Sequence, residues 1–260
     1  MNTLPSRKNM LEISSERDFP VRAEISKRYC ILSSPRAGGT LLGRMLFETG
    51  LAGDPLEYFN LRLLQLARER FGNQVLSSLD FLHLMEARRT SRNGVFGVKL
   101  QFDQMLRAYR SEVPNEAMLK FLRGNQCLFW IRRRNRLRQA ISHAIAVRTN
   151  VWSSEEGDTP SSEISVLDCI RSLQTIAFQD LGWEALVEQF ALEPIIIWYE
   201  ELATDYERIC TFALSCLGLS DAINAIPPPP IQRQSGTLND RLYGDLVGYL
   251  AHPTSGPYTS

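Results

Sequence analysis

The chain has 260 residues, 44% of them hydrophobic, and its 29 basic and 29 acidic side chains cancel to a net charge of zero. This composition is typical of a globular protein with a sizeable core. Binders of nucleic acid and of membrane surfaces usually carry a basic excess, so we expect neither as a partner.

The sequence has no features of a secreted or membrane-inserted protein. The N-terminus contains no apolar segment like that of a secretory signal, and no run approaches the ~20 apolar residues of a membrane span. Five cysteines without a CxxC pair predict reduced, mostly buried thiols, and three scattered histidines give no spacing for a metal. We therefore expect a cytoplasmic protein without membrane insertion and without a metal site.

The apolar runs predict a parallel sheet. After residues 1–27, an N-terminal arm expected to be poorly ordered or peripheral, runs of strand length follow at 29–34, 95–100, 126–132 and 193–200. These runs are nearly continuous in apolar residues, as in strands covered on both faces. Helical patterns lie between them, which predicts βαβ units. The predicted fold class is α/β, a central parallel sheet flanked by helices, in a single domain spanning 1–260.

Two segments depart from this alternation. Residues 151–163 are polar and acidic, and we expect a loop or lid there. Four consecutive prolines at 227–230 favour a polyproline-like conformation, so residues 227–260 are predicted to form an extended C-terminal segment.

The break after the first strand predicts an anion-binding loop. It reads SSPRAGGT, residues 33–40, and the next apolar run has a helical pattern. The N–H groups at a helix start bind phosphate or sulfate, Gly38 and Gly39 allow a close approach, and Thr40 adds a hydroxyl. Arg36 adds a positive charge and a bidentate fork. The alternative is a Gly-rich turn without a ligand; the GK[ST] ending of a nucleotide-triphosphate P-loop is absent.

A second basic group follows the third strand. Five arginines occur there: Arg132, Arg133, Arg134, Arg136 and Arg138. Ligands of open parallel sheets bind beyond the carboxyl ends of the strands, so this group and the loop are expected at the same edge. The pair suggests a ligand with two separated anionic groups, such as a nucleotide bisphosphate. The alternative is a solvated, basic start of a helix.

These pieces together resemble the sulfotransferases that use 3′-phosphoadenosine 5′-phosphosulfate (PAPS), and in particular the bacterial trehalose 2-sulfotransferase-like family. The matching pieces are SPRAGGTLLGRML, TGLAGDPLEYFN, GVFGVKLQFDQ, WIRRRNRLRQAISHA, the stretch 149–152 and WYEELATDYE, in family order from about residue 29 to residue 218. The resemblance implies the P-loop-NTPase-like sulfotransferase fold. It also implies PAPS as co-substrate, a sugar or glycolipid acceptor, and a homodimer.

The resemblance also implies roles for individual residues. Glu57, in GDPLEYFN, occupies the position of the general base. The positions implied for the nucleotide are Arg36, Ala37, Gly38, Gly39 and Thr40 at the 5′-phosphosulfate, Arg134 and Ser142 at the 3′-phosphate, and Arg233 and Gln234 at the far end. The family loop usually reads RSGST, so Ala37 and Gly39 replace two serines here.

Three further side chains are judged from their positions. Lys99 lies at the carboxyl end of the second strand and can reach the oxygens of the leaving phosphate. His143 follows Ser142 on the same helix, and because adjacent helical residues point about 100° apart we expect no catalytic role for it. Trp152 can stack on a sugar or pack internally.

Two other functions remain open at this stage. The chain can be a catalytically weakened paralogue that binds the nucleotide without transferring anything. The other is a P-loop-like kinase, which fits the sequence less well because the GK[ST] ending is missing.

Overall fold

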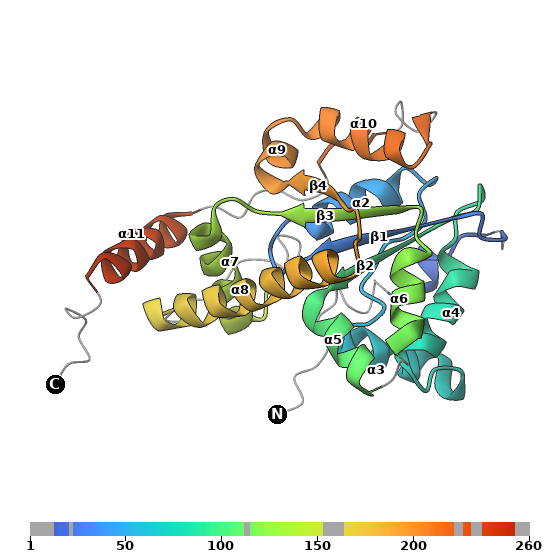
Figure 1. Cartoon of the computed structure of the whole chain (residues 1–260), viewed down its shortest axis with the longest axis horizontal. Coiled ribbons are helices and arrows are strands. Elements are labelled where there is room, and N and C mark those ends of the chain that lie inside the picture. Colours follow the sequence, from blue (N-terminus) through green and yellow to red (C-terminus); the bar gives the residue numbers. More distant parts are fainter. Residues whose placement is uncertain are drawn as a thin grey trace.

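The computed structural model describes residues 13–20, 23–111, 115–152, 164–220, 226–229 and 236–252. Within these residues, a four-stranded sheet has helices on both faces (Figure 1). The strands are β1 (Lys27–Ser33), β2 (Val95–Gln101), β3 (Cys127–Arg132) and β4 (Ile195–Trp198). The α-helices are α2 (Gly39–Glu48), α3 (Leu61–Phe71), α4 (Ser78–Arg89), α5 (Phe102–Ser111), α6 (Asn115–Arg123), α7 (Arg136–Thr149), α8 (Val166–Gln189), α9 (Tyr199–Thr204), α10 (Tyr206–Cys216) and α11 (Thr237–Ala251).

The strands lie in the order β2-β1-β3-β4, and every neighbouring pair is parallel. The predicted α/β class and the parallel sheet are therefore confirmed. The chain runs from β1 outward to β2 at one edge, and then to β3 on the other side of β1. Such a reversal of strand order leaves a crevice at the carboxyl ends of the two central strands.

The side chains of β1 explain why the sheet is covered on both faces. Tyr29 and Ile31 pack in one core with α2 and α10. Cys30 and Leu32 point the other way, into a core formed with α3, α4, α5, α6 and α8. All four side chains are inaccessible to solvent, so the strand is apolar at successive positions and not only at alternate ones.

Side-chain caps determine where several helices begin. Asn60 accepts hydrogen bonds from the first N–H groups of α3, and Asn135 accepts one from Arg138 in α7. Ser77 and Ser165 form capping boxes with acidic residues three positions later, at the starts of α4 and α8. These caps satisfy N–H groups that no helix can satisfy internally.

The prediction of an extended segment over 227–260 is wrong for residues 237–251, which form α11. Leu242 and Leu246 are buried against α7 and α8, and this apolar contact stabilises a helix that the polar local sequence did not indicate. Figure 1 shows α11 beyond α7 and α8, at the end of the molecule away from α6.

The prediction of a poorly ordered or peripheral arm over 1–27 is wrong for the described residues of that segment. Ile13 is buried in the main core, and Asp18 forms ion pairs with Arg70 (3.3 Å) and Arg88 (3.2 Å). Ser15–Arg17 form a short 3-10 helix, and Lys27 begins β1. Of the predicted loop at 151–163, residues 153–163 lie outside the described residues.

Candidate active site

A cavity of about 800 Å³ opens at the carboxyl edge of the sheet. It lies where β1 and β2 end and where α2 and α7 begin. Its polar lining includes Ser34, Arg36, Thr40, Glu57, Asn60, Lys99, Gln101, Gln104, Arg133, Arg138, Ser142 and His143. The Gly-rich loop and two of the five arginines after β3, Arg133 and Arg138, therefore share one cavity.

The loop between β1 and α2 has a backbone conformation suited to an anion. Arg36 and Gly38 both have positive φ, 61° and 102°. A Cβ atom at Gly38 would lie 2.7 Å from Cδ2 of Tyr199, so a side chain has no room there. The loop leads into the first turn of α2, whose N–H groups have no acceptors within the helix and lie at its positive end. These are the features of helix starts that can bind an anion.

The two positions where the family has serine differ in their surroundings. Ala37 is fully buried in the core shared with α2 and α10, so a hydroxyl there would lie under the loop. Gly39 faces Lys99: a Cβ would lie 3.3 Å from Cδ of Lys99 and 3.2 Å from Oγ of Ser33. The absence of a side chain at Gly39 thus gives room to the aliphatic stem of Lys99.

Glu57 and Asp103 are carboxylates that line this cavity, and both oxygens of Glu57 accept hydrogen bonds. Oε1 lies 2.9 Å from Nζ of Lys99 and accepts from Gln101 at 3.0 Å. Oε2 accepts from Gln104 at 2.7 Å and from Asn60 at 3.0 Å. Asn60 has two tasks, because its oxygen caps α3 while its amide nitrogen orients Glu57.

Burial by itself would raise the pKa of Glu57. The charge of Lys99 and the hydrogen bonds from Lys99, Gln104 and Asn60 oppose this effect, and the pKa falls to about 2. Glu57 is therefore an ionised carboxylate at every pH at which proteins normally work. It can accept a proton from a substrate only when one of these donors is exchanged for a substrate hydroxyl.

Lys99 joins this carboxylate to the anion-binding loop. Its Nζ lies 2.9 Å from Oε1 of Glu57 and also 2.9 Å from Oγ1 of Thr40. The side chain is 8% exposed and comes from β2, so its position is set by the sheet. A charged group in this position interacts with an anion in the loop and with the carboxylate.

Arg36 extends from the loop to α7. Its Nε donates to Oγ of Ser142 at 2.9 Å, and its guanidinium also donates to the carbonyl of Trp152. Gln139, also from α7, donates to Oγ of Ser34 at 3.0 Å and to the carbonyl of Pro35 at 2.7 Å. Side-chain hydrogen bonds therefore hold the loop against α7.

Of the arginines that follow β3, some line the cavity and others lie outside it. Arg133 and Arg138 line the cavity, and Arg133 lies over the ring of Tyr199 at 4.5 Å. Arg134 is absent from the lining; its side chain is half-exposed and forms a 2.5 Å ion pair with Glu201. The role of Arg134 at a 3′-phosphate stays a prediction.

His143, which we expected on another helix face, lines the cavity beside Ser142. It is nearly buried, and its ring meets that of Trp152 edge-on at 6.1 Å. Burial, and then the charge of Arg36, lower the pKa of His143 to about 4, so the ring is neutral at neutral pH. Trp152 packs on His143 and also lines the cavity.

The structure thus brings seven of the predicted site residues to one cavity: Arg36, Gly38, Gly39, Thr40, Glu57, Lys99 and Ser142. Ala37 lies beneath the loop, Arg134 lies outside the lining, and Arg233 and Gln234 lie outside the described residues. Sequence reasoning missed the three amides around Glu57. Gln101 is the last residue of β2 and Gln104 lies in the first turn of α5, so both come within five residues of Lys99 at the carboxyl end of a strand; this position is the signal that could have found them.

Among the residues that the structure describes, no group of three or more His, Cys, Asp or Glu side chains could hold a metal ion. Within the same residues, no helix is both long and apolar enough to span a bilayer.

The cavity combines a Gly-rich loop at a helix start, arginines and an ionised carboxylate, an arrangement suited to the transfer of an anionic group. The family model of the Stf0 sulphotransferases matches residues 28–243 of this chain. The chain therefore belongs to the Stf0 sulphotransferase family, as the sequence motifs predicted.

Two curated relatives are similar to most of the chain. A trehalose 2-sulfotransferase of Mycobacterium tuberculosis (strain ATCC 35801 / TMC 107 / Erdman) is 27% identical over 249 residues, which cover 82% of this chain and 91% of the relative. A trehalose 2-sulfotransferase of Mycolicibacterium smegmatis (strain ATCC 700084 / mc(2)155) is 27% identical over 246 residues, with the same coverage of both chains.

Proposed function

We propose that this sulfotransferase moves a sulfuryl group from PAPS to a hydroxyl of a carbohydrate or glycolipid, with Glu57 as general base. One observation carries the proposal. Lys99 contacts Thr40 of the anion-binding loop and Glu57 at the same distance, 2.9 Å, so the loop and the base lie within reach of one ammonium group. The names of the two relatives support a trehalose-like acceptor.

The residues present fit a donor with two anionic ends. The loop lines the cavity through Arg36, Gly38, Gly39 and Thr40, and its left-handed Gly38 leads into the first N–H groups of α2, where an anion can bind. Ser142, Arg133 and Arg138 supply a hydroxyl and two guanidinium groups at another part of the same cavity. PAPS supplies the sulfuryl group, and the resemblance assigns its 5′ end to the loop and its 3′-phosphate to Ser142 and Arg134.

The chemistry requires a base and stabilisation of negative charge. The acceptor oxygen forms the new bond to sulfur, the bond from sulfur to the 5′-phosphate oxygen breaks, and Glu57 takes the hydroxyl proton. Asn60, Gln101 and Gln104 hold the carboxylate in place for that task. Lys99, Arg36 and the start of α2 stabilise the negative charge that develops on the leaving group.

The direct test combines binding and transfer. We expect adenosine 3′,5′-bisphosphate to bind in calorimetry without Mg²⁺, and label from ³⁵S-PAPS to appear on trehalose or another sugar. Binding without transfer to any acceptor would indicate the weakened paralogue. Turnover of ATP with Mg²⁺, without use of PAPS, would support the kinase instead.

Replacing Gly38 with alanine is expected to weaken bisphosphate binding by at least about tenfold. A side chain at a left-handed φ is strained by roughly 1–3 kcal/mol, and here the Cβ also meets Tyr199 at 2.7 Å. Calorimetric titration with adenosine 3′,5′-bisphosphate measures the change. Gly50→Ala is the matched control, because Gly50 also has positive φ (69°) but has nothing within 4 Å of a Cβ. Equal losses in both variants would contradict a role for the loop in binding.

Replacing Arg134 with alanine is expected to weaken bisphosphate binding by roughly 1.5–3 kcal/mol, the range for hydrogen bonds to charged groups. This requires the half-exposed guanidinium to leave Glu201 for the 3′-phosphate. Arg208→Ala is the control, since Arg208 is another exposed arginine in an ion pair, with Asp205. If Arg134→Ala binds normally and Arg133→Ala does not, the 3′-phosphate assignment passes to Arg133.

A further inference from the structure

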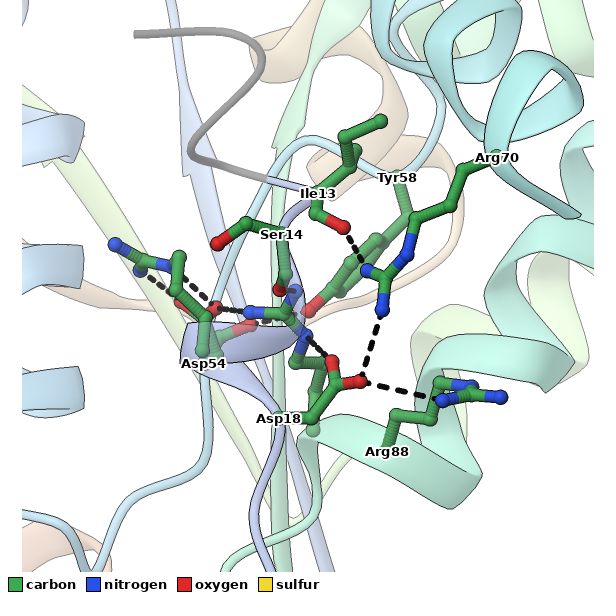
Figure 2. Close-up of polar contacts among 9 residues, drawn as sticks. Ile13, Ser14, Asp18, Asp54, Tyr58, Arg70 and Arg88 are labelled. Carbon is green, nitrogen blue, oxygen red and sulfur yellow. Dashed lines mark hydrogen bonds and ion pairs between the residues drawn. The ribbon is translucent and has the colours of Figure 1, made fainter.

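A cluster of ion pairs attaches the N-terminal segment 13–20 to the chain just before Glu57 (Figure 2). We call it the Asp54 cluster; its members are Arg17, Asp18, Asp54, Arg70, Arg88 and Arg89. Its residues come from the N-terminal segment, from α3 and α4, and from the loop between α2 and α3. None of these residues lines the cavity, so the cluster is separate from the site.

Asp54 is the buried centre of this cluster. Its side chain is 1% exposed, and two arginines approach it. Arg17 reaches both oxygens, with Nη2 at 2.5 Å from Oδ1 and Nε at 2.8 Å from Oδ2, while Arg89 reaches Oδ2 at 2.6 Å. Because a buried carboxylate is costly without partners, these contacts fix the position of Asp54.

The chain from Asp54 to Glu57 lies along β2. The N–H of Asp54 donates to the carbonyl of Arg89 at 3.2 Å, and Leu56 forms a parallel bridge with Val98. The N–H of Lys99 donates to the carbonyl of Leu56 at 2.9 Å. This short stretch therefore runs beside the sheet edge, with the ion-pair cluster at its start and the carboxylate of Glu57 at its end.

Further contacts hold Asp54 and the two residues of the N-terminal segment, Arg17 and Asp18, in place. The hydroxyl of Tyr58 donates to the carbonyl of Asp54 at 2.5 Å, as Figure 2 shows. Arg17 lies over the ring of Phe47 at 3.9 Å, and Asp18 bonds to three arginines of α3 and α4. The segment 13–20 is thereby attached to α2, α3 and α4.

We propose that Arg17 is a positioning residue for Glu57, and that the segment 13–20 is needed for catalysis through this contact and not through the cavity. The inference rests on the proposed function, in which Glu57 is the base. Without Arg17, the buried carboxylate of Asp54 keeps only its ion pair with Arg89 among the members of the cluster. The stretch 54–57 can then shift along β2. A displacement of the base by about 1 Å lowers the rate, because proton transfer requires close alignment.

The test is Arg17→Gln in the full chain, with kcat and bisphosphate affinity measured separately. We expect kcat to fall by roughly 10- to 100-fold. The dissociation constant for adenosine 3′,5′-bisphosphate should stay within about twofold, because the anion loop is not displaced. Arg17→Lys should recover part of kcat, since it restores the charge without the bidentate fork.

Arg28→Gln is the matched control. The Arg28→Gln variant also loses an ion pair with α4, at Glu86, but neither of these residues belongs to the Asp54 cluster. A normal kcat in Arg17→Gln would overturn the inference, and so would an equal loss of kcat and of bisphosphate affinity, which indicates general damage. If Arg17→Gln gives no folded protein, Arg17→Lys is judged by the same two measurements.

The companion variant Glu57→Gln separates this inference from the proposed function. An active Glu57→Gln enzyme would overturn the proposed base, whatever Arg17 does. An inactive Glu57→Gln enzyme with a fully active Arg17→Gln enzyme would overturn only the positioning role.

Discussion

Replacing Glu57 with glutamine is expected to reduce sulfuryl transfer by roughly 10²- to 10⁴-fold, the usual contribution of a positioned general base. The amide keeps the size of the side chain and can still contact Gln101 and Gln104, but it cannot accept the hydroxyl proton. Glu57 also does not belong to the anion-binding loop. Initial rates with ³⁵S-PAPS should therefore fall while adenosine 3′,5′-bisphosphate binds as in the wild type.

Two comparisons make this result specific. Glu86→Gln also removes one carboxylate from an ion pair, but on α4 away from the cavity, and it should transfer at the wild-type rate. Asp103→Asn tests the other carboxylate that lines the cavity, whose pKa is raised by burial and by the charge of Glu57. Loss of transfer in Asp103→Asn with full activity in Glu57→Gln would move the base to Asp103. A thermal unfolding scan checks that each variant is folded.

Replacing Lys99 with methionine is expected to lower kcat by about 10²- to 10³-fold, as loss of one group that stabilises developing charge does. Methionine keeps the buried aliphatic stem beside Gly39 but removes the ammonium group from Thr40 and Glu57. Steady-state kinetics at saturating PAPS should show the loss mainly in kcat.

The same variant has a predicted pH signature. Burial raises the pKa of Glu57, and the charge of Lys99 is the first of the effects that lower it to about 2. Without that charge the pKa rises. Because the carboxylate is the active form, activity is lost as pH falls through this pKa, so the acid limb of the kcat profile moves to higher pH.

The control for this variant is Lys27→Met. Lys27 is the first residue of β1, at the opposite end of the sheet, where its ammonium group donates to the carbonyl of Leu217. Its pH profile should match that of the wild type. An acid limb in Lys99→Met that stays in place, or moves to lower pH, would contradict the electrostatic link between Lys99 and Glu57.

The sequence was informative wherever one local signal determines the structure. The strands predicted at 29–34, 95–100, 126–132 and 193–200 correspond to β1 to β4, with boundaries that differ by at most two residues. Continuous apolar runs of this short length are typical of strands buried on both faces, and the alternation with helices implied their parallel order. The Gly-rich loop was also predictable from a local signal. The groups expected to bind an anion there are the backbone N–H groups at the start of the following helix.

Side-chain directions after a strand were less predictable. Arg133 and Arg138 line the cavity while Arg134 turns to Glu201, although all three follow β3 within a few residues. The carboxylate of Glu200 accepts the N–H groups of Arg134 and Asn135, at 3.0 and 3.1 Å. A contact across 66 residues of chain therefore fixes the backbone at this turn, and no local pattern contains it.

By itself, the sequence determined the α/β class, the position of the Gly-rich loop and the family, because each depends on local spacing, hydrophobicity or a contiguous motif. Only the tertiary structure decided which groups surround Glu57, that α11 is a helix, and that Arg17 pairs with Asp54, three residues before Glu57. The physical reason is the same in each case: these arrangements are stabilised by burial and charge pairing between segments far apart in the chain.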